Sequence, residues 1–239
     1  MYDPRPRRRA GHRFAVLAAV ALAAGSLHLA SGSPAGAQQP PKPESSSPTA
    51  ELASAAAAVG GEVVRPPGEP VTAVGAPAGQ AIPVDGGGGT PRAAAQAFVN
   101  QYGPAFGEED PAQDLTVDRT TPMGAGGKAV HYQQLEGGVP VIAGELNVHV
   151  APGGKVRSAA GELSTGDPVD TTPDVNEEAA AATAVARVAT DASVDLAVLS
   201  AGAPALQVYD PALLDEPGER RLVWRIEVRS DVVPVRVEV

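Results

Sequence analysis

The four histidines are the residues best suited to metal or acid–base chemistry in this chain of 239 residues. A zincin site needs two histidines one helical turn apart with a glutamate beside them. His12 and His28 lie near the N-terminus, and His131 and His149 lie in predicted strands, so no His-Glu-x-x-His occurs. Glu145 and His149 are four residues apart, which on a strand separates them by roughly 13 Å. His131 and His149 could supply two ligands at most across neighbouring strands. We therefore expect solvent-facing histidines, no metal site and no cofactor.

Other candidate motifs fail on spacing. The acidic run Glu108-Glu109-Asp110 beside Pro111 is typical of a solvated loop. The stretch from Gly124 to Lys128 lacks the first glycine and the Ser/Thr of a phosphate-binding loop, and it predicts a turn entering a strand. There is no cysteine, so disulfides and cysteine nucleophiles are excluded. The sequence also lacks the Gly-x-Ser-x-Gly motif of a serine hydrolase. We expect these residues to recognise a protein surface and not to catalyse a reaction.

Acidic charge dominates beyond the first 13 residues. That segment holds five of the 18 basic residues and one of the 28 acidic ones, so the rest carries 13 against 27, a formal charge of −14. Such a body repels phosphate backbones, and we expect no nucleic-acid partner. Aromatic residues make up 3%, and Gly and Pro together number 51, which predicts a modest core of Val, Leu and Ala.

Residues 1–37 have the parts of a secretory signal peptide. Five arginines precede the apolar run Phe14–Ala24, which is too short to span a bilayer comfortably. Ala35 and Ala37 provide the small residues of a cleavage site, with cleavage before Gln38. The alternative is an uncleaved membrane anchor, because the apolar stretch can be extended to Ala30. We expect a secreted protein with no membrane contact after cleavage.

Three segments follow the predicted signal peptide. Residues 38–89 predict a linker rich in Pro, Gly and Ala, disordered over 38–50 and with possible short strands at 62–65, 71–74 and 81–84. Thr90 and Pro91 then predict a helix start, and apolar residues at helical spacing follow as far as Tyr102. Strand patterns at 128–135, 139–142, 145–150 and 155–160 predict an antiparallel meander with this helix against one face.

A second unit is predicted over 167–239. Asp174 and Glu177 resemble a capping box that opens a helix to about Thr190, and strand patterns follow at 207–209, 221–228 and 233–239. Trp224 is expected in the core, or as an anchor for a partner at the sheet surface. Apolar alternation continues to Val239, so we expect a truncated unit and a piece of a longer protein. The predicted fold class is α+β, with two small units that each pack one helix on an antiparallel sheet.

The run from His131 to Val150 resembles the fungalysin/thermolysin propeptide (FTP) domain, and the resemblance covers residues 90–166. It is carried by a Tyr-Gln-Gln strand, a Gly-Val-Pro-Val corner, a Gly-Glu-Leu opening, a Val-His-Val strand and a terminal glycine. The motif residues are Tyr132, Gln134, Gly138, Val139, Pro140, Val141, Gly144, Leu146, Val148, His149 and Gly161. Residues 167–239 resemble a PepSY domain more weakly, through the acidic helix start and the strand around Trp224.

The resemblance implies a pro-region of a secreted thermolysin-like zinc metallopeptidase, without its catalytic domain. Such a pro-region acts as an intramolecular chaperone and inhibitor of the catalytic domain, its partner in cis or in trans, and the zinc belongs to that partner. The sequence leaves two alternatives open. One is a stand-alone secreted protease inhibitor or cell-surface binding module, and the other is an enzyme in its own right.

Overall fold

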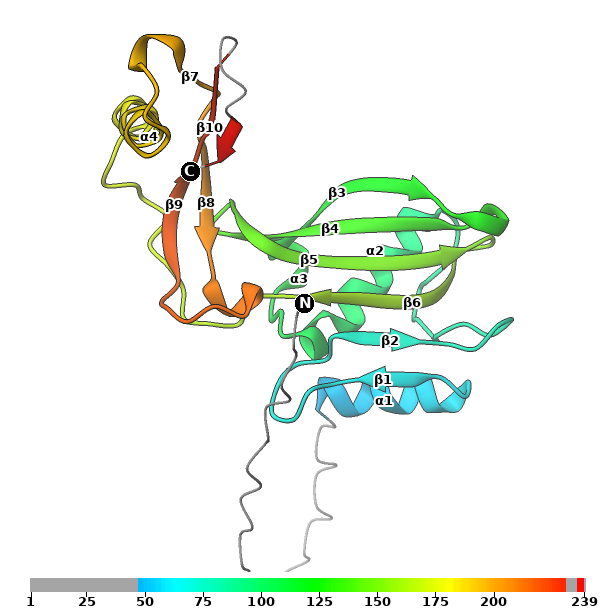
Figure 1. The fold of residues 1–239 in the computed structure, drawn as a ribbon. Helices are drawn as coiled ribbons and strands as arrows, with labels where there is room; N and C mark the ends of the chain where they lie inside the picture. The colour runs from blue at the N-terminus through cyan, green and yellow to red at the C-terminus, as the bar shows by residue number, and fades with distance from the viewer. Residues whose placement is uncertain (1–46, 231–235, 239) are drawn as a thin grey trace, which may run out of the picture. The chain divides into compact units, whose positions relative to one another are not determined.

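The computed structural model describes residues 47–230 and 236–238, which belong to one unit, Ser45–Val239 (Figure 1). The predicted signal peptide, its cleavage site between Ala37 and Gln38, and the first part of the predicted linker lie outside the described residues. So do Val233, Val235 and Val239 of the last predicted strand. No helix of the described part is long and apolar enough to cross a bilayer.

The fold is α+β, as the sequence predicted. The α-helices are α1 (Pro48–Ala58), α2 (Pro91–Tyr102), α3 (Pro111–Asp114) and α4 (Glu177–Ala192), and the 3₁₀-helices are η1 (Gly103–Phe106), η2 (Gly124–Gly126), η3 (Leu196–Val198) and η4 (Pro211–Leu214). The strands are β1 (Glu62–Val64), β2 (Ala73–Gly75), β3 (Leu115–Pro122), β4 (Lys128–Glu136), β5 (Val139–Ala151), β6 (Lys155–Glu162), β7 (Ser200–Ala201), β8 (Ala205–Tyr209), β9 (Arg221–Arg225), β10 (Glu227–Arg229) and β11 (Arg236–Glu238).

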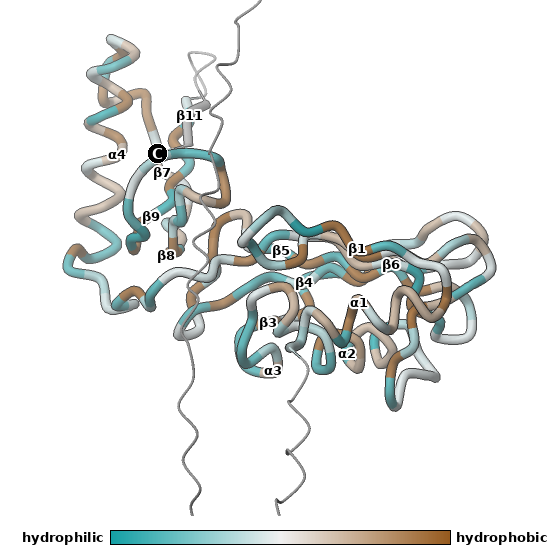
Figure 2. The backbone as a smooth tube through the Cα atoms, turned by 90° about the horizontal axis from the view of Figure 1, so that it is seen from below, coloured by the Kyte–Doolittle hydropathy of each residue, from teal (hydrophilic) through white to brown (hydrophobic). Residues whose placement is uncertain are grey.

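Six antiparallel strands form the main sheet, in the order β1-β2-β6-β5-β4-β3. Helices α1, α2 and α3 lie on the same side of it, and no helix among the described residues lies on its other face (Figures 1 and 2). The core lies between the sheet and these helices. Its largest fully buried side chains include Tyr132, Phe98, Phe106, Leu52 and Leu146.

Helix α2 forms where the sequence predicted it. Thr90 is its N-cap and accepts a hydrogen bond from the Ala93 amide at 3.2 Å, while Pro91 occupies the first turn. The apolar positions at 3.6-residue spacing are all buried against the sheet, and Phe98 packs on the rings of Tyr102 and Phe106. Both the cap and the apolar spacing therefore predicted this helix correctly.

The linker prediction needs correction within the described residues. Helix α1 begins at Pro48, and the Ser47 hydroxyl accepts from the Ala50 amide at 3.3 Å. Leu52 and Ala56 are buried in the main core, and β1 and β2 extend the main sheet through β6. Residues 81–84 form no strand, although the Ile82 amide donates to Val156 O. The Pro- and Ala-rich composition gave no sign that this segment forms a helix and two strands that belong to the main sheet and its core.

Strand β5 replaces the two strands predicted at 139–142 and 145–150. Ala143 adopts a positive φ of 62°, and the pairing with β4 shifts register beside it. The side-chain amide of Gln133 donates to the carbonyls of Val141 (2.7 Å) and Gly144 (3.1 Å). These bonds satisfy backbone oxygens that the bulge removes from the ladder, so the strand continues through it.

The C-terminal part contains α4 and two short sets of strands. Strand β8 pairs in parallel with β5 at Val141↔Val208 and antiparallel with β9, whereas β7, β10 and β11 form a separate sheet. The predicted strand 221–228 is divided at Ile226 into β9 and β10. The helix begins later than predicted, because Asn176 and not Asp174 is the N-cap: its Oδ1 accepts from the Ala179 amide at 2.9 Å.

Candidate interaction surfaces

The apolar motif residues of β4 and β5 lie in the interior of the main sheet. Tyr132, Leu146 and Val148 are fully buried beneath α2. The Tyr132 hydroxyl donates to Gln96 Oε1 at 3.4 Å, and burial raises the pKa of this phenol. Packing in the core explains why these three positions hold large side chains.

Two motif glycines permit close approaches of the backbone. A Cβ on Gly161 would lie 2.0 Å from the carbonyl oxygen of Glu145 on the neighbouring strand. A Cβ on Gly144 would lie 2.7 Å from Oε1 of Gln134. Gly138 has a φ of 84° in the turn between β4 and β5, a conformation that glycine adopts without strain. The glycines of the motif therefore fix the strand register and the turn.

Val139, Pro140 and Val141 start β5 and join the main sheet to the C-terminal strands. Val141 is 1% exposed and forms the parallel pair with Val208. Beyond the bulge at Ala143, the same strand belongs to the main sheet. The Gly-Val-Pro-Val corner is thus the part of β5 that pairs both with β4 of the main sheet and with β8 of the C-terminal strands.

Gln134 occupies the centre of a buried polar network at this junction. Its Nε2 donates to Glu108 Oε2 (3.0 Å) and to the Ser164 carbonyl (2.9 Å), and its Oε1 accepts from the Ser164 amide (2.8 Å). The Ser164 hydroxyl donates to Asp210, whose other oxygen accepts from the Ala212 amide at 3.0 Å. The network connects β4 to η4 through side chains that are at most 6% exposed: Glu108, Gln134, Ser164 and Asp210.

Arg220 extends the network to the start of β9. Its guanidinium donates to Glu136 and to the carbonyl of Asp167, and its Nε lies 3.4 Å from Asp210 Oδ2. Side-chain exposures of 13% for Arg220 and 18% for Glu136 place this ion pair mostly away from water. Breaking such a pair leaves a charge without its partner, which is costly in a protein interior.

Glu108 contradicts the predicted solvated loop. It is 6% exposed, and burial raises the pKa of its carboxyl, an effect that the hydrogen bond from Gln134 partly opposes. Glu109 and Asp110 are exposed, as predicted. The acidic run gave no signal for this difference, because the side chain that bonds Glu108 in the interior, Gln134, comes from β4; the other oxygen of Glu108 accepts from the Asp110 amide at 3.3 Å.

The helix-free face of the main sheet carries polar side chains, including the motif residue His149. We call it the outer face and define it by the half-buried residues His131, Gln133, Glu145, Asn147, His149 and Ser158 and the exposed Ala160, which the strand register places on one side. Both histidines were predicted to face solvent, and each is instead half-buried beside a hydroxyl. Thr121 Oγ1 lies 2.9 Å from His131 Nε2, and Ser158 Oγ lies 3.0 Å from His149 Nδ1.

Two atoms near the middle of the outer face lack hydrogen bonds. His131 and Asn147 are directly opposite each other in the β4–β5 register. His131 Nδ1 and Asn147 Oδ1 are both buried without a partner in the described part of the chain. Buried polar atoms usually find a partner, so these two atoms are exceptions within the sheet.

These surfaces offer groups for recognition. Within residues 47–230 and 236–238, no three His, Cys, Asp or Glu side chains are grouped so that they could hold a metal ion. Ser164 pairs with a carboxylate and not with a histidine base, so it lacks the activation of a serine nucleophile.

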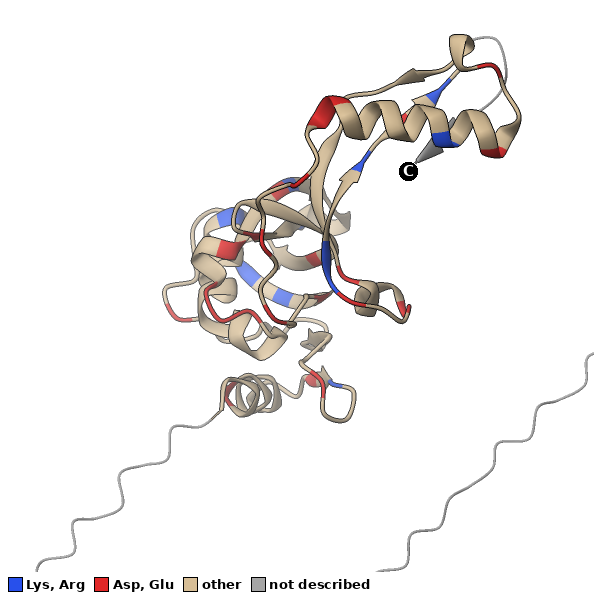
Figure 3. Ribbon diagram, turned by 90° about the vertical axis from the view of Figure 1, so that its left-hand side faces the viewer, with Lys and Arg blue, Asp and Glu red and all other residues tan. Residues whose placement is uncertain are grey.

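Basic positions, blue in Figure 3, recur along the C-terminal strands beneath α4 in this otherwise acidic chain.

Comparison with known proteins identifies one segment. Residues 113–163 match the family model described as Fungalysin/Thermolysin Propeptide Motif. The matched range runs from the end of α3 to the residue after β6, and so includes β3, β4, β5 and β6. It supports a thermolysin-like propeptide and implies association with a protease catalytic domain. No curated protein matches the chain.

Proposed function

We propose that this chain is the pro-region of a secreted thermolysin-like zinc metalloendopeptidase, and that it assists folding of the catalytic domain and inhibits it. The propeptide match over residues 113–163 carries the proposal. The N-terminal basic and apolar segment supports export through the secretory route. The helix and strands of residues 167–239 support a second, PepSY-like unit of the same pro-region.

We assign the contact with the catalytic domain to the outer face of the main sheet. The matched segment supplies most of this face, and no helix covers it (Figure 1). The face carries polar side chains, among them His131, Asn147 and His149, that a partner surface can contact.

The experiment is a refolding assay with a thermolysin-like catalytic domain. The domain is unfolded, diluted into native buffer with and without the 239-residue chain, and assayed for peptidase activity after the chain has been digested. We expect the chain to raise the yield of active enzyme. Added to the already folded enzyme, the intact chain should reduce peptide hydrolysis with one-to-one stoichiometry.

Paired variants locate the surface. Ala160→Arg places a large cation on the outer face at an exposed β6 position, and Ala182→Arg places the same group on the exposed side of α4. The first should abolish both activities and the second should leave them intact. Inhibition without assisted folding would favour the stand-alone inhibitor, and a chain that does neither would contradict the proposal.

A further inference from the structure

The chain between β6 and α4 forms neither helix nor strand. We call residues 165–176 the strap. Its side chains are exposed except those of Val169 and Thr171, which are half-buried. Within residues 47–230 and 236–238, no backbone–backbone hydrogen bond involves residues 165–175. The strap can therefore open locally without breaking a ladder of backbone bonds, and its opening costs little free energy.

Two other exposed connections are closed by backbone bonds. In the turn 77–80, the Gln80 amide donates to the Pro77 carbonyl at 3.0 Å. In the turn after η4, the Glu216 amide donates to the Pro211 carbonyl at 2.9 Å. Exposed loops are the usual positions of proteolytic cleavage, and a loop without such bonds is the easiest to draw into the extended form that a protease binds.

An ion pair holds the first half of the strap. Glu136 accepts from the Val169 amide and from Arg220, and the Arg220 guanidinium also donates to the Asp167 carbonyl. We call Glu136 and Arg220 the clasp. The strap packs closely on it, because a Cβ on Gly166 would lie 2.5 Å from Cδ of Arg220. The order of this half therefore depends on two side chains from β4 and from the segment before β9.

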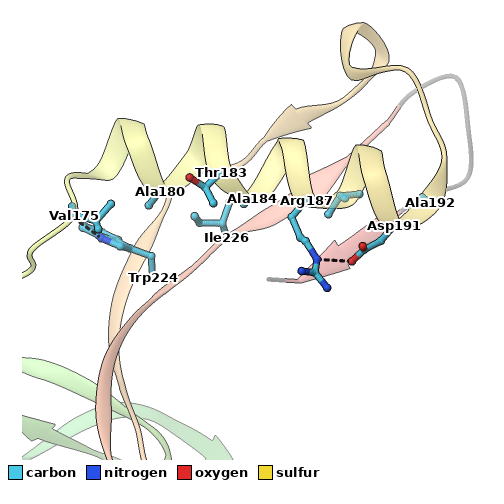
Figure 4. A pocket seen from close by; sticks show the side chains of 10 residues that line it. Val175, Ala180, Thr183, Ala184, Arg187, Asp191, Ala192, Trp224 and Ile226 are labelled. Atoms are coloured by element: carbon cyan, nitrogen blue, oxygen red, sulfur yellow. Dashed lines mark hydrogen bonds and ion pairs between the residues drawn. The ribbon is translucent and has the colours of Figure 1, made fainter.

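Two further contacts lie on either side of a stretch that nothing else holds. Thr171 packs on the turn between β4 and β5, where a Cβ on Gly137 would be 2.8 Å from its Oγ1. Trp224 Nε1 donates to the Val175 carbonyl at 2.8 Å (Figure 4). Between these contacts, residues 172–174 are exposed and form hydrogen bonds only within the strap in the described structure.

The strap ends at a groove beneath α4. The groove encloses about 790 Å³ and is lined on one side by α4 and on the other by Trp224 and Ile226 (Figure 4). The ring of Trp224 is thus half-buried at the end of the strap and not enclosed in the core that the sequence predicted. Val175 lines the same groove and is 48% exposed, so an apolar side chain that a protease subsite can accept adjoins the exposed stretch.

We propose that the strap is a proteolytic processing site, cut by an endopeptidase within residues 170–175 and protected by the clasp. Hydrolysis breaks one C–N bond of the backbone. The oxygen of a water molecule joins the carbonyl carbon, which becomes a carboxylate, and the two protons of that water go to the nitrogen, which becomes an ammonium group. The site lies outside the outer face, so the inference does not require the proposed function.

Cleavage would leave the C-terminal part attached without a covalent link. The pair Val141↔Val208 and the side-chain bonds around Ser164 and Asp210 would remain. These contacts act within one chain before the cut and between two chains after it, so the attachment becomes dependent on concentration. Processing of the strap would therefore release the C-terminal part on dilution.

Limited proteolysis of the full 239-residue chain locates the cut. The probe is subtilisin, an endopeptidase of broad specificity, and mass spectrometry gives the position and rate of each cleavage. Within residues 47–230 we expect the first cleavage at a bond between 170 and 175. First cleavage in the turns 77–80 or 215–219 would overturn the inference. Gel filtration of the cut chain after dilution should separate two fragments, and fragments that stay together at nanomolar concentration would contradict the release.

Engineered trypsin sites supply matched controls, because residues 165–176 contain no Lys or Arg. Asp174→Arg adds a site in the strap, Ala78→Arg adds one in the turn 77–80, and Ala182→Arg adds one on α4, all at exposed positions. The strap site should be cut at least about tenfold faster than either control, since cleavage follows the population of the open form. Equal rates at the three sites would contradict an easily opened strap.

A second pair of variants tests the clasp. Glu136→Ala removes the acceptor of the Val169 amide and the partner of Arg220, and Asp191→Ala breaks the exposed ion pair with Arg187 on α4. The first should raise the rate of strap cleavage, relative to cleavage elsewhere in 177–230, by about tenfold, and the second should leave this ratio unchanged. Glu136→Gln keeps one acceptor oxygen and should fall between them. An unchanged ratio in both Glu136 variants would overturn the role of the clasp.

Discussion

The core beneath the main sheet and the core beneath α4 are built from different side chains. The main core contains 21 buried apolar residues with an aromatic cluster at its centre, Phe98, Tyr102 and Phe106. Among the described side chains, the α4 core contains five, two of them alanines, and borders the open groove. Because stabilisation follows the apolar area removed from water, we expect the main sheet to be the more stable region.

The largest test of this comparison removes one large side chain from each core. Phe98→Ala should lower the free energy of unfolding by about 3–5 kcal/mol, because the ring is fully buried and its neighbours cannot close the cavity. Ile226→Ala should cost about 2 kcal/mol, since water from the groove reaches the vacated space. Urea denaturation followed by circular dichroism measures both, and equal losses would contradict the difference between the cores.

A substitution in the strand register is expected to have the next largest effect. Gly161→Ala should destabilise the main sheet by about 1–3 kcal/mol, because its Cβ meets the backbone of Glu145 and Leu146. Gly75→Ala is the matched control on neighbouring β2, since a Cβ there has no atom within 4 Å. Thermal unfolding of the two variants should separate them clearly. A control as unstable as Gly161→Ala would show that the close approach is not the cause.

Hydrogen exchange compares the two regions in the unaltered chain. Amides of α4 and β10 should exchange at least tenfold faster than those of β4, β5 and β6, a difference of about 1.4 kcal/mol in opening free energy. The reason is the smaller core beneath α4. Equal protection in both regions without the peptide would argue against a weaker α4 region.

The pH dependence of the junction is the smallest expected effect. Because the pKa of Glu108 is raised in the fold, the folded state binds its proton more tightly than the unfolded state does. Stability from this group is complete below the ordinary carboxyl pKa of about 4.3 and is lost as pH rises through the higher folded value. Glu108→Gln should remove this group's share of the slope and cost about 1 kcal/mol, because its amide nitrogen cannot accept one of the two hydrogen bonds that the Glu108 carboxylate accepts from Gln134 Nε2 and the Asp110 amide.

Denaturant unfolding at pH 4 and pH 7 measures the slope, and Glu109→Gln is the exposed control that should not change it. A slope that survives in Glu108→Gln would assign the pH dependence to other carboxyls. Asp114 is the first to examine, since burial, together with Asp110 and Glu136, also raises its pKa.

The sequence predicted those helices and strands whose caps and apolar spacing lie within the element itself. The Thr90 cap and the spacing from Ala94 to Tyr102 were sufficient for α2, and the alternation over 145–150 was sufficient for that part of β5. Helix α1 was missed because its alanines resemble the linker before it, and only packing of Leu52 reveals a buried face. The propeptide resemblance predicted at the motif was confirmed over residues 113–163.

The junction and the groove were not predictable in the same way. Gln134 meets Ser164 30 residues later, and Ser164 meets Asp210 46 residues later, so no spacing rule brings them together. Glu108 was therefore assigned to solvent. The groove beneath α4 depends on how the helix packs on β9 and β10, and this too is decided by the tertiary structure.

Strand β5 belongs to two sets of strands, yet Val141↔Val208 is the single backbone register pair that links β5 to β8 in the described residues. Most of the attachment between the main sheet and the C-terminal strands is therefore made by the side chains of Gln134, Ser164, Asp210, Glu136 and Arg220. A ladder of backbone bonds tolerates almost any sequence, whereas an attachment of this kind depends on the identity of each residue. Single substitutions at these five positions are therefore expected to loosen the C-terminal strands from the main sheet.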